Sequence, residues 1–164
     1  MNKLNLIQLN NQSPYEVWSE SECDYFFATD YGVIYKISFG DDAPIWKSGA
    51  YTFDIQNTNH KTSPNDIKVK QTIVCIVEEF FRINNDILLY ICETGDDKQA
   101  IRNRLFIRWF NEYSFQQNYI LRAAEVKDGK QLNFAAIIVR RDHPDLESIL
   151  QTFDETIQYF KGKP

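Results

Sequence analysis

Residues 86–92, with the sequence DILLYIC, form an apolar run in which polar and apolar positions do not alternate. A run of this length is typical of a strand that is covered on both faces, and such a strand lies inside a sheet. Helical patterns flank the run, over about residues 64–82 and about residues 97–113. A central strand between two amphipathic helices predicts a layered domain that contains both α and β structure.

The first helical pattern begins with the segment Ser63-Pro64-Asn65-Asp66. Ser63 is suited to accept a hydrogen bond as the N-cap, Pro64 suits the first helical position, and Asp66 completes a pattern like a capping box. The apolar residues that follow cover a broad arc, which predicts packing on a sheet. They are Val69, Ile73, Val74, Ile76, Val77, Phe80 and Phe81.

Two β-hairpins and a C-terminal helix are predicted around this centre. Residues 24–39 contain two aromatic and β-branched runs around Thr29-Asp30-Tyr31-Gly32, and residues 118–139 contain two runs around Asp128-Gly129. Residues 50–57 alternate as a strand does. Asp142-His143-Pro144 opens the last helix, whose apolar positions are Leu146, Ile149, Leu150, Phe153, Ile157 and Phe160.

The predicted order is therefore β-β-β-α-β-α-β-β-α. We expect an α+β fold with a mixed, mostly antiparallel sheet of about six strands and three helices, because the helical and strand patterns alternate irregularly. A chain of 164 residues suits a single domain. We assign residues 23–164 to this domain and residues 1–22 to an N-terminal arm or a short strand.

Composition argues against several classes of function. The net charge of −5 does not favour nucleic acid or an anionic membrane as a partner. The three cysteines form no CxxC pair, and the two histidines lie far apart, so we expect free thiols and no metal site. The N-terminus lacks the apolar core of a signal peptide, and no run is long enough to span a membrane. These features predict a soluble, cytoplasmic protein.

The turn Thr94-Gly95-Asp96-Asp97 is one candidate site. Helix capping explains its residue types, because Thr94 or Asp96 can cap the following helix and Gly95 permits the tight turn. The alternative is a ligand site, since open α/β sheets place ligands in loops after central strands.

Arg102 is the second candidate, because it falls inside the apolar arc of the helix that follows this turn. A buried arginine needs a partner, so we expect either an internal ion pair or an anion site that Arg102 shares with Lys98 and the helix N-terminal amides. Arg104 and Arg108 fall on the polar side, where they form either a solvated helix face or a small basic patch with Arg140 and Arg141. Trp46, in the loop APIWKSG, is a candidate anchor for a partner.

Two resemblances add to these predictions. The block LYICETGDDKQAIRNRLFIRWF (89–110), together with YFFATDYGVIYKISF (25–39), resembles a small bacterial family known only as a domain of unknown function. This resemblance implies a bacterial, cytoplasmic setting and no particular activity.

The second resemblance is one of architecture. The order of elements is similar to the core of the GCN5-related acetyltransferase fold, in which a turn and helix-terminal amides after the third of these strands bind the pyrophosphate of acyl-coenzyme A. The matching segment is PNDIKVKQTI, which contains no glycine. The resemblance implies an acyl-coenzyme A site at Lys68, Val69, Lys70 and Gln71.

The sequence shows no recognisable spacing of a catalytic nucleophile with a general base, of a phosphate-binding loop or of a metal-ligand cluster. We therefore expect a non-enzymatic interaction or regulatory domain with a protein partner and possible self-association, and without a cofactor. The alternative is a diverged acyl-coenzyme A-dependent N-acyltransferase. A third hypothesis is small-anion sensing at residues 94–102.

Overall fold

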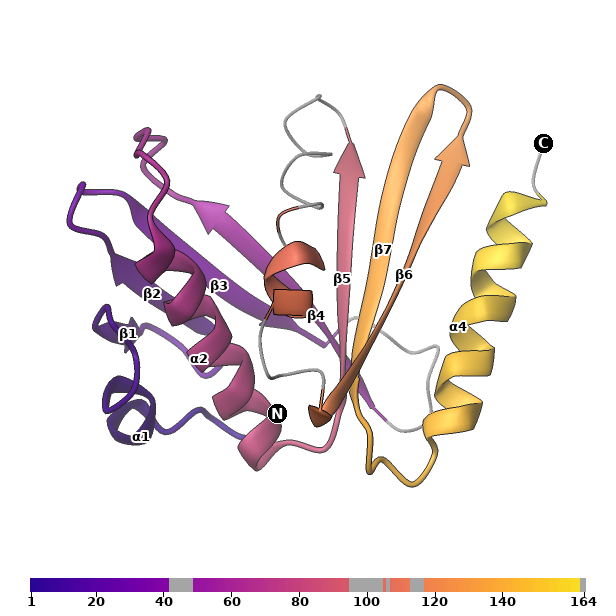
Figure 1. The fold of residues 1–164 in the computed structure, drawn as a ribbon, viewed down its shortest axis with the longest axis horizontal. Helices are drawn as coiled ribbons and strands as arrows, with labels where there is room; N and C mark the ends of the chain where they lie inside the picture. Colours follow the sequence, from indigo (N-terminus) through magenta and orange to yellow (C-terminus); the bar gives the residue numbers. More distant parts are fainter. Residues whose placement is uncertain (42–48, 95–104, 106, 113–116, 163–164) are drawn as a thin grey trace. The chain divides into compact units, whose positions relative to one another are not determined.

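The computed structural model describes residues 1–41, 49–94, 105, 107–112 and 117–162, with the backbone alone for residues 92–94, 128 and 131. Over these ranges the protein has an α+β fold, as predicted, with a mixed seven-stranded sheet in the order β1-β2-β3-β4-β5-β7-β6 (Figure 1). The elements are α1 (Leu6–Asn10), β1 (Val17–Ser19), β2 (Asp24–Ala28), β3 (Ile34–Gly40), β4 (Ala50–Asn57), α2 (Ile67–Ile83), β5 (Ile87–Thr94), β6 (Tyr119–Asp128), β7 (Gln131–Arg140) and α4 (Leu146–Lys161). Residues 107–112, inside the predicted second helix, are also helical.

The chain divides into two compact units. Unit 1 comprises residues 1–40 and 53–85, and unit 2 comprises residues 41–52 and 86–164. The assignment of residues 1–22 to an arm and of 23–164 to one domain stays a prediction. No helix in the described ranges is long and apolar enough to cross a membrane.

The first predicted hairpin is confirmed in unit 1. Strands β2 and β3 pair antiparallel from Asp24↔Ser38 to Ala28↔Ile34. Gly32 has a φ of 75° in the turn, a conformation that a residue with a side chain rarely adopts. Along β3, Ile37 and Phe39 are buried and Ser38 between them is only partly covered, which is the alternation of a half-buried strand.

Helix α2 begins three positions later than the sequence pattern predicts. Its N-cap is Asp66, whose carboxylate accepts the Lys68 amide, so the prediction of Ser63 as N-cap and Pro64 as first helical residue is wrong. The same carboxylate accepts the hydroxyl of Tyr15, which is 51 residues away in sequence. A tertiary hydrogen bond therefore fixes the cap at Asp66, and a local pattern cannot reveal it. The predicted end near Arg82 agrees with the observed end at Ile83.

Residues 1–22 form a short strand, β1, and a short helix, α1. With β1 the sheet has one strand more than the six predicted. The helix is capped by the side chain of Asn5, which accepts the amides of Ile7 and Gln8. Strand β1 pairs antiparallel with β2. The segment is held in unit 1 by hydrogen bonds from its backbone amides to Asn84 and Tyr25.

Unit 2 contains the central strand that the apolar run predicts. Residues Ile87–Thr94 pair with β4 in parallel and with β7 in antiparallel orientation, and the stretch from Ile87 to Tyr90 is buried. The second predicted hairpin is also confirmed, because β6 and β7 pair continuously from Tyr119↔Arg140 to Asp128↔Gln131. Gly129 occupies the connecting turn with a φ of 62°.

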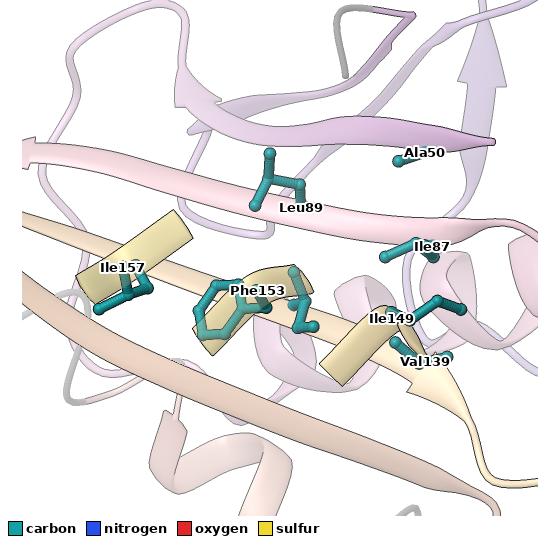
Figure 2. Close-up of a cluster of buried hydrophobic side chains, with 8 residues drawn as sticks. Ala50, Ile87, Leu89, Val139, Ile149, Phe153 and Ile157 are labelled. Carbon is teal, nitrogen blue, oxygen red and sulfur yellow. The ribbon is translucent and has the colours of Figure 1, made fainter. Parts of the chain in front are cut away.

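The hydrophobic cluster under α4 in unit 2 is mainly aliphatic. Ile149, Phe153 and Ile157 project from one side of α4 onto the sheet, as Figure 2 shows. They meet a layer of buried strand residues: Ala50, Ile87, Leu89, Ile137 and Val139. Phe160, which the sequence pattern places on the same apolar stripe, is instead 45% exposed, because the buried part of the helix ends at Ile157.

Candidate functional site

Most residues of the predicted site lie outside the described residues. This is true of the residues around the turn after β5 and of the loop tryptophan, namely Asp96, Lys98, Arg102, Arg104 and Trp46. Thr94 is the last residue of β5, where only its backbone is described. The choice between an internal ion pair and an anion site at Arg102 therefore stays open.

Arg108 is described, and it lies on the surface as predicted. Its guanidinium Nε lies 2.6 Å from a carboxylate oxygen of Glu112, one helical turn away, and 73% of its side chain is exposed. Arg140 similarly pairs with Asp142 at 2.6 Å. Exposed ion pairs of this kind contribute little to stability. Both arginines thus have a carboxylate neighbour, which favours a solvated surface over a basic patch.

A cluster of polar side chains in unit 1 joins the start of α2 to the β2–β3 turn. We call Tyr15, Asp30, Asp66 and Lys68 the helix-start cluster. The ammonium of Lys68 lies 2.9 Å from the Asp30 carboxylate and 5.4 Å from the centre of the Tyr15 ring. This ion pair raises the pKa of Lys68, so the side chain stays charged. The cluster ties together three segments that are distant in sequence.

Tyr15 lies at the centre of this cluster. Its hydroxyl donates to Asp66 at 2.5 Å and accepts the Asp30 amide at 3.3 Å. Burial, and then the hydrogen bond to the Asp66 carboxylate, raises the pKa of Tyr15 to about 12. The hydroxyl is therefore protonated at neutral pH, and it holds the capping carboxylate in place. Such a phenol stabilises structure and is a poor general base near pH 7.

The residues that the architectural resemblance assigns to acyl-coenzyme A are partly occupied. The Lys68 amide donates to the Asp66 carboxylate at 3.0 Å, and the Val69 amide donates to the Asp66 carbonyl at 3.2 Å. Val69 and Lys70 are buried, whereas Lys68 is about half exposed. A capping carboxylate also places negative charge where a pyrophosphate would have to bind, which opposes binding of an anion there.

Two large apolar side chains extend from this cluster into solvent. Tyr31 is 54% exposed and follows Asp30 in the turn, and Ile67 is 65% exposed and precedes Lys68. The Lys68–Asp30 ion pair links the two segments that carry them. We call Tyr31, Ile67, Asp30 and Lys68 the Tyr31–Ile67 surface. Sequence reasoning did not identify this surface, because only the contact between Lys68 and Asp30 connects the two segments.

A second exposed aromatic group lies on the outer face of the β1–β2–β3 ladder. Trp18 stacks on Phe26 with 5.8 Å between ring centroids, and the Lys36 ammonium lies 5.9 Å from the centre of the Phe26 ring. Lys36 also pairs with Asp24 at 3.3 Å. The tryptophan packs against its strand neighbours, so this group stabilises the sheet surface. Among the described residues, no group of three or more acidic, histidine or cysteine side chains is arranged to hold a metal ion.

The chain is similar to one known protein family. The model of a family of unknown function, DUF6169, matches residues 65–155, which is more than half of the chain. The protein belongs to the DUF6169 family. This agrees with the expected membership of a family of unknown function. The search of curated proteins found no match.

The DUF6169 match covers only part of the helix-start cluster. It begins at Asn65, so Asp66 and Lys68 of the cluster lie inside the match, and Tyr15 and Asp30 lie before it. The Tyr31–Ile67 surface is divided in the same way, because Ile67 is inside the match and Tyr31 is not. The matched range also includes the block of residues 89–110, but the match extends over several elements and does not single that block out. The family match therefore covers the chain from the start of α2 into α4, and it assigns no activity.

Proposed function

We propose that this DUF6169 protein acts by binding a protein partner through the Tyr31–Ile67 surface, without catalysis of its own. The observation that carries the proposal is the exposure of two large apolar side chains, each next in sequence to one member of a charged pair. Tyrosine is enriched in protein interfaces, where it supplies apolar contact area together with a polar tip. The proposal keeps the predicted cytoplasmic setting and protein partner, which stay predictions.

The local structure supports a rigid binding surface. Tyr31 lies in a turn closed by backbone hydrogen bonds from Gly32 to Thr29 and from Thr29 to Val33. Ile67 is the first residue of a capped helix. Because both positions are fixed before binding, little conformational entropy is lost when a partner covers them. The adjacent Lys68–Asp30 pair offers one charge of each sign at the rim, which favours a partner with complementary charges.

Site-specific photo-crosslinking in cells that make the protein naturally tests this proposal. A photoreactive phenylalanine analogue replaces Tyr31 in one sample and Tyr159 in the control, because Tyr159 is 65% exposed in the other unit. We expect a discrete protein adduct from position 31 only, and its loss when Ile67→Glu is added. Equal adduct patterns from both positions in folded protein would contradict the proposal.

A second candidate, the acyl-coenzyme A-dependent transferase, rests on sheet topology. Strands β4 and β5 are parallel at residues 50–52 and 87–89, whereas the other pairings described are antiparallel. Helix α2 forms the crossover between them. A β-α-β crossover within a mixed sheet fits the architecture that the acetyltransferase resemblance implies, and the capped helix start counts against cofactor binding there.

Thermal unfolding with coenzyme A and acetyl-coenzyme A distinguishes the two candidates. A ligand at 100 times its dissociation constant adds roughly 2.7 kcal/mol to stability, which raises Tm by several degrees. A saturable shift that Lys68→Glu abolishes, and that Lys127→Glu in β6 leaves intact, would show cofactor binding at the start of α2 and favour the second candidate. We expect no saturable shift with either ligand.

A further inference from the structure

Strand β6 forms an edge of the sheet in the described structure. It is ten residues long and pairs with β7 at every position, and it stands last in the strand order. Helix α4 packs over β6 and β7 in unit 2 (Figure 1). A long edge strand presents a row of backbone donors and acceptors, and proteins usually protect such an edge or pair it.

The hydrogen bonds show which residues of β6 face this edge. The Arg141 amide donates to the Asn118 carbonyl at 2.8 Å, and these two residues are directly opposite when the β6–β7 register is continued by one position. Hydrogen-bonded pairs recur at every second residue of an antiparallel ladder. Even-numbered residues of β6 therefore bond to β7, and the amides and carbonyls of the odd-numbered residues point away from it.

The same count holds across the sheet. It directs the backbone groups of odd-numbered residues of β5 toward β4, and the Ile87 amide does donate to the Gly49 carbonyl, in the loop immediately before β4. Side chains of even-numbered β6 residues lie on the α4 side, where Ala124 and Val126 pack against the core and Arg122 pairs with Asp154 at 2.7 Å. The odd-numbered side chains lie on the other face.

A second β6 strand can pair with this edge in a symmetric register. A two-fold axis perpendicular to a sheet pairs a strand with itself antiparallel, and each residue then faces one of the same parity. With the axis at Ala123, small residues meet at the centre and no like charges are opposite. The resulting pairs are Tyr119 with Lys127, Ile120 with Val126, Leu121 with Glu125, Arg122 with Ala124, and Ala123 with Ala123.

Neighbouring registers are less favourable. An axis at Arg122 sets two guanidiniums opposite each other, and an axis at Glu125 does the same with two carboxylates. An axis at Ala124 sets both Ile120 and Leu121 opposite a charged residue, Asp128 and Lys127, whereas the Ala123 axis sets Leu121 opposite Glu125 but pairs Ile120 with Val126.

We propose that the protein forms a symmetric homodimer by antiparallel pairing of β6 with β6 of a second copy, centred on Ala123. The outward backbone groups of the odd-numbered residues then exchange hydrogen bonds across the axis, and the sheet becomes continuous through both copies. Ile120 of one copy lies beside Val126 of the other, which extends the apolar layer under α4. The occupant is a second copy because in this register two alanines meet at the centre, the β-branched residues Ile120 and Val126 pair, and no like charges are opposite.

Sedimentation velocity over a range of concentrations tests the dimer with two matched variants. Ala123→Pro removes one outward amide and keeps the β7 ladder, because proline is tolerated where an edge amide faces solvent. Ala123→Thr keeps the amide. We expect a concentration-dependent dimer for the natural chain and for Ala123→Thr, and a monomer for Ala123→Pro. A natural chain that stays monomeric, or an Ala123→Pro variant that dimerises equally, would overturn the proposal.

Crosslinking gives a readout that does not depend on the proline variant folding. In a background with the three cysteines replaced by serine, a cysteine at position 123 lies beside its counterpart, within reach of a short bifunctional thiol reagent. A cysteine at position 127 lies eight residues from its counterpart along the paired strands, roughly 27 Å. We expect Ala123→Cys to give a crosslinked dimer and Lys127→Cys to give none. Equal yields at both positions would overturn the register.

Discussion

Different kinds of contact stabilise the interior of each unit. In unit 1, buried aromatic rings contact one another, with Phe80 stacked on Phe39 at 5.0 Å and edge-on to Phe81 at 5.2 Å. Side-chain hydrogen bonds there also join segments that are far apart in sequence, such as Asn2 with Asn84. In unit 2, long antiparallel ladders carry an aliphatic core under α4.

The difference shows which structure depends on particular partners. Aliphatic side chains at helical or strand spacing can pack in many equivalent ways, so a periodic pattern is enough to specify unit 2. Hydrogen bonds and ring contacts require particular atoms at particular distances. Unit 1 should therefore respond more strongly to single changes at its polar contacts than unit 2 does.

The largest expected effect is at the aromatic core of unit 1. Phe80 is fully buried between rings, so Phe80→Ala should lower the free energy of unfolding by about 3–5 kcal/mol, through lost burial and the cavity that remains. Urea unfolding followed by tryptophan fluorescence measures the change. Tyr31→Ala, at an exposed ring, should stay within about 0.5 kcal/mol. A loss below about 1 kcal/mol for Phe80→Ala would contradict the importance of these ring contacts.

A smaller effect is expected where the N-terminal segment meets the end of α2. Asn84 accepts the Asn2 amide at 2.7 Å, so Asn84→Ala removes the acceptor of this amide and should cost about 1–3 kcal/mol. Hydrogen exchange should accelerate at Asn2 and Asn5. The neighbouring exposed residue provides a control, Asn85→Ala, which should leave both amides protected. Unchanged exchange in Asn84→Ala would show that other contacts hold the segment.

Deprotonation of Tyr15 in the helix-start cluster should destabilise unit 1 at high pH. The pKa of Tyr15 is raised from 10.0 to about 12, so its contribution to stability is complete below pH 10 and is lost as pH rises from 10 toward 12. Burial also raises the pKa of Tyr25, so absorbance at about 295 nm should show a late-titrating component that loses one phenol in Tyr15→Phe. The stability of Tyr15→Phe should also fall less between pH 10 and 12. A titration curve identical to that of the natural chain would refute the assignment to Tyr15.

The smallest effect is expected at the surface ion pair of unit 2. Arg122 and Asp154 are both partly exposed, so a double-mutant cycle with Arg122→Ala and Asp154→Ala should give a coupling of about 0.2–1 kcal/mol that falls with added salt. Chemical denaturation of the four proteins provides the measurement. A coupling above about 2 kcal/mol would mean that polar contacts matter as much in unit 2 as in unit 1.

Much of the fold could be predicted because its signals are local. The β2–β3 and β6–β7 hairpins follow from apolar runs around glycine turns, and the central position of β5 follows from its continuous apolar sequence. The candidate site could not be predicted in the same way. The Tyr31–Ile67 surface exists because Lys68 meets Asp30, 38 residues away, and no periodic pattern records that meeting.

The sequence by itself determined the α+β class, the two hairpins, the buried central strand and the amphipathic helices, because backbone geometry turns residue spacing directly into faces and turns. The start of α2 depends on tertiary structure, because the Tyr15 hydroxyl donates a hydrogen bond to the capping carboxylate of Asp66. Tertiary structure also decided that the first residues form α1 and β1 and bind Asn84 and Tyr25. Such choices depend on which distant atoms come within hydrogen-bonding distance, and folding alone brings those atoms together.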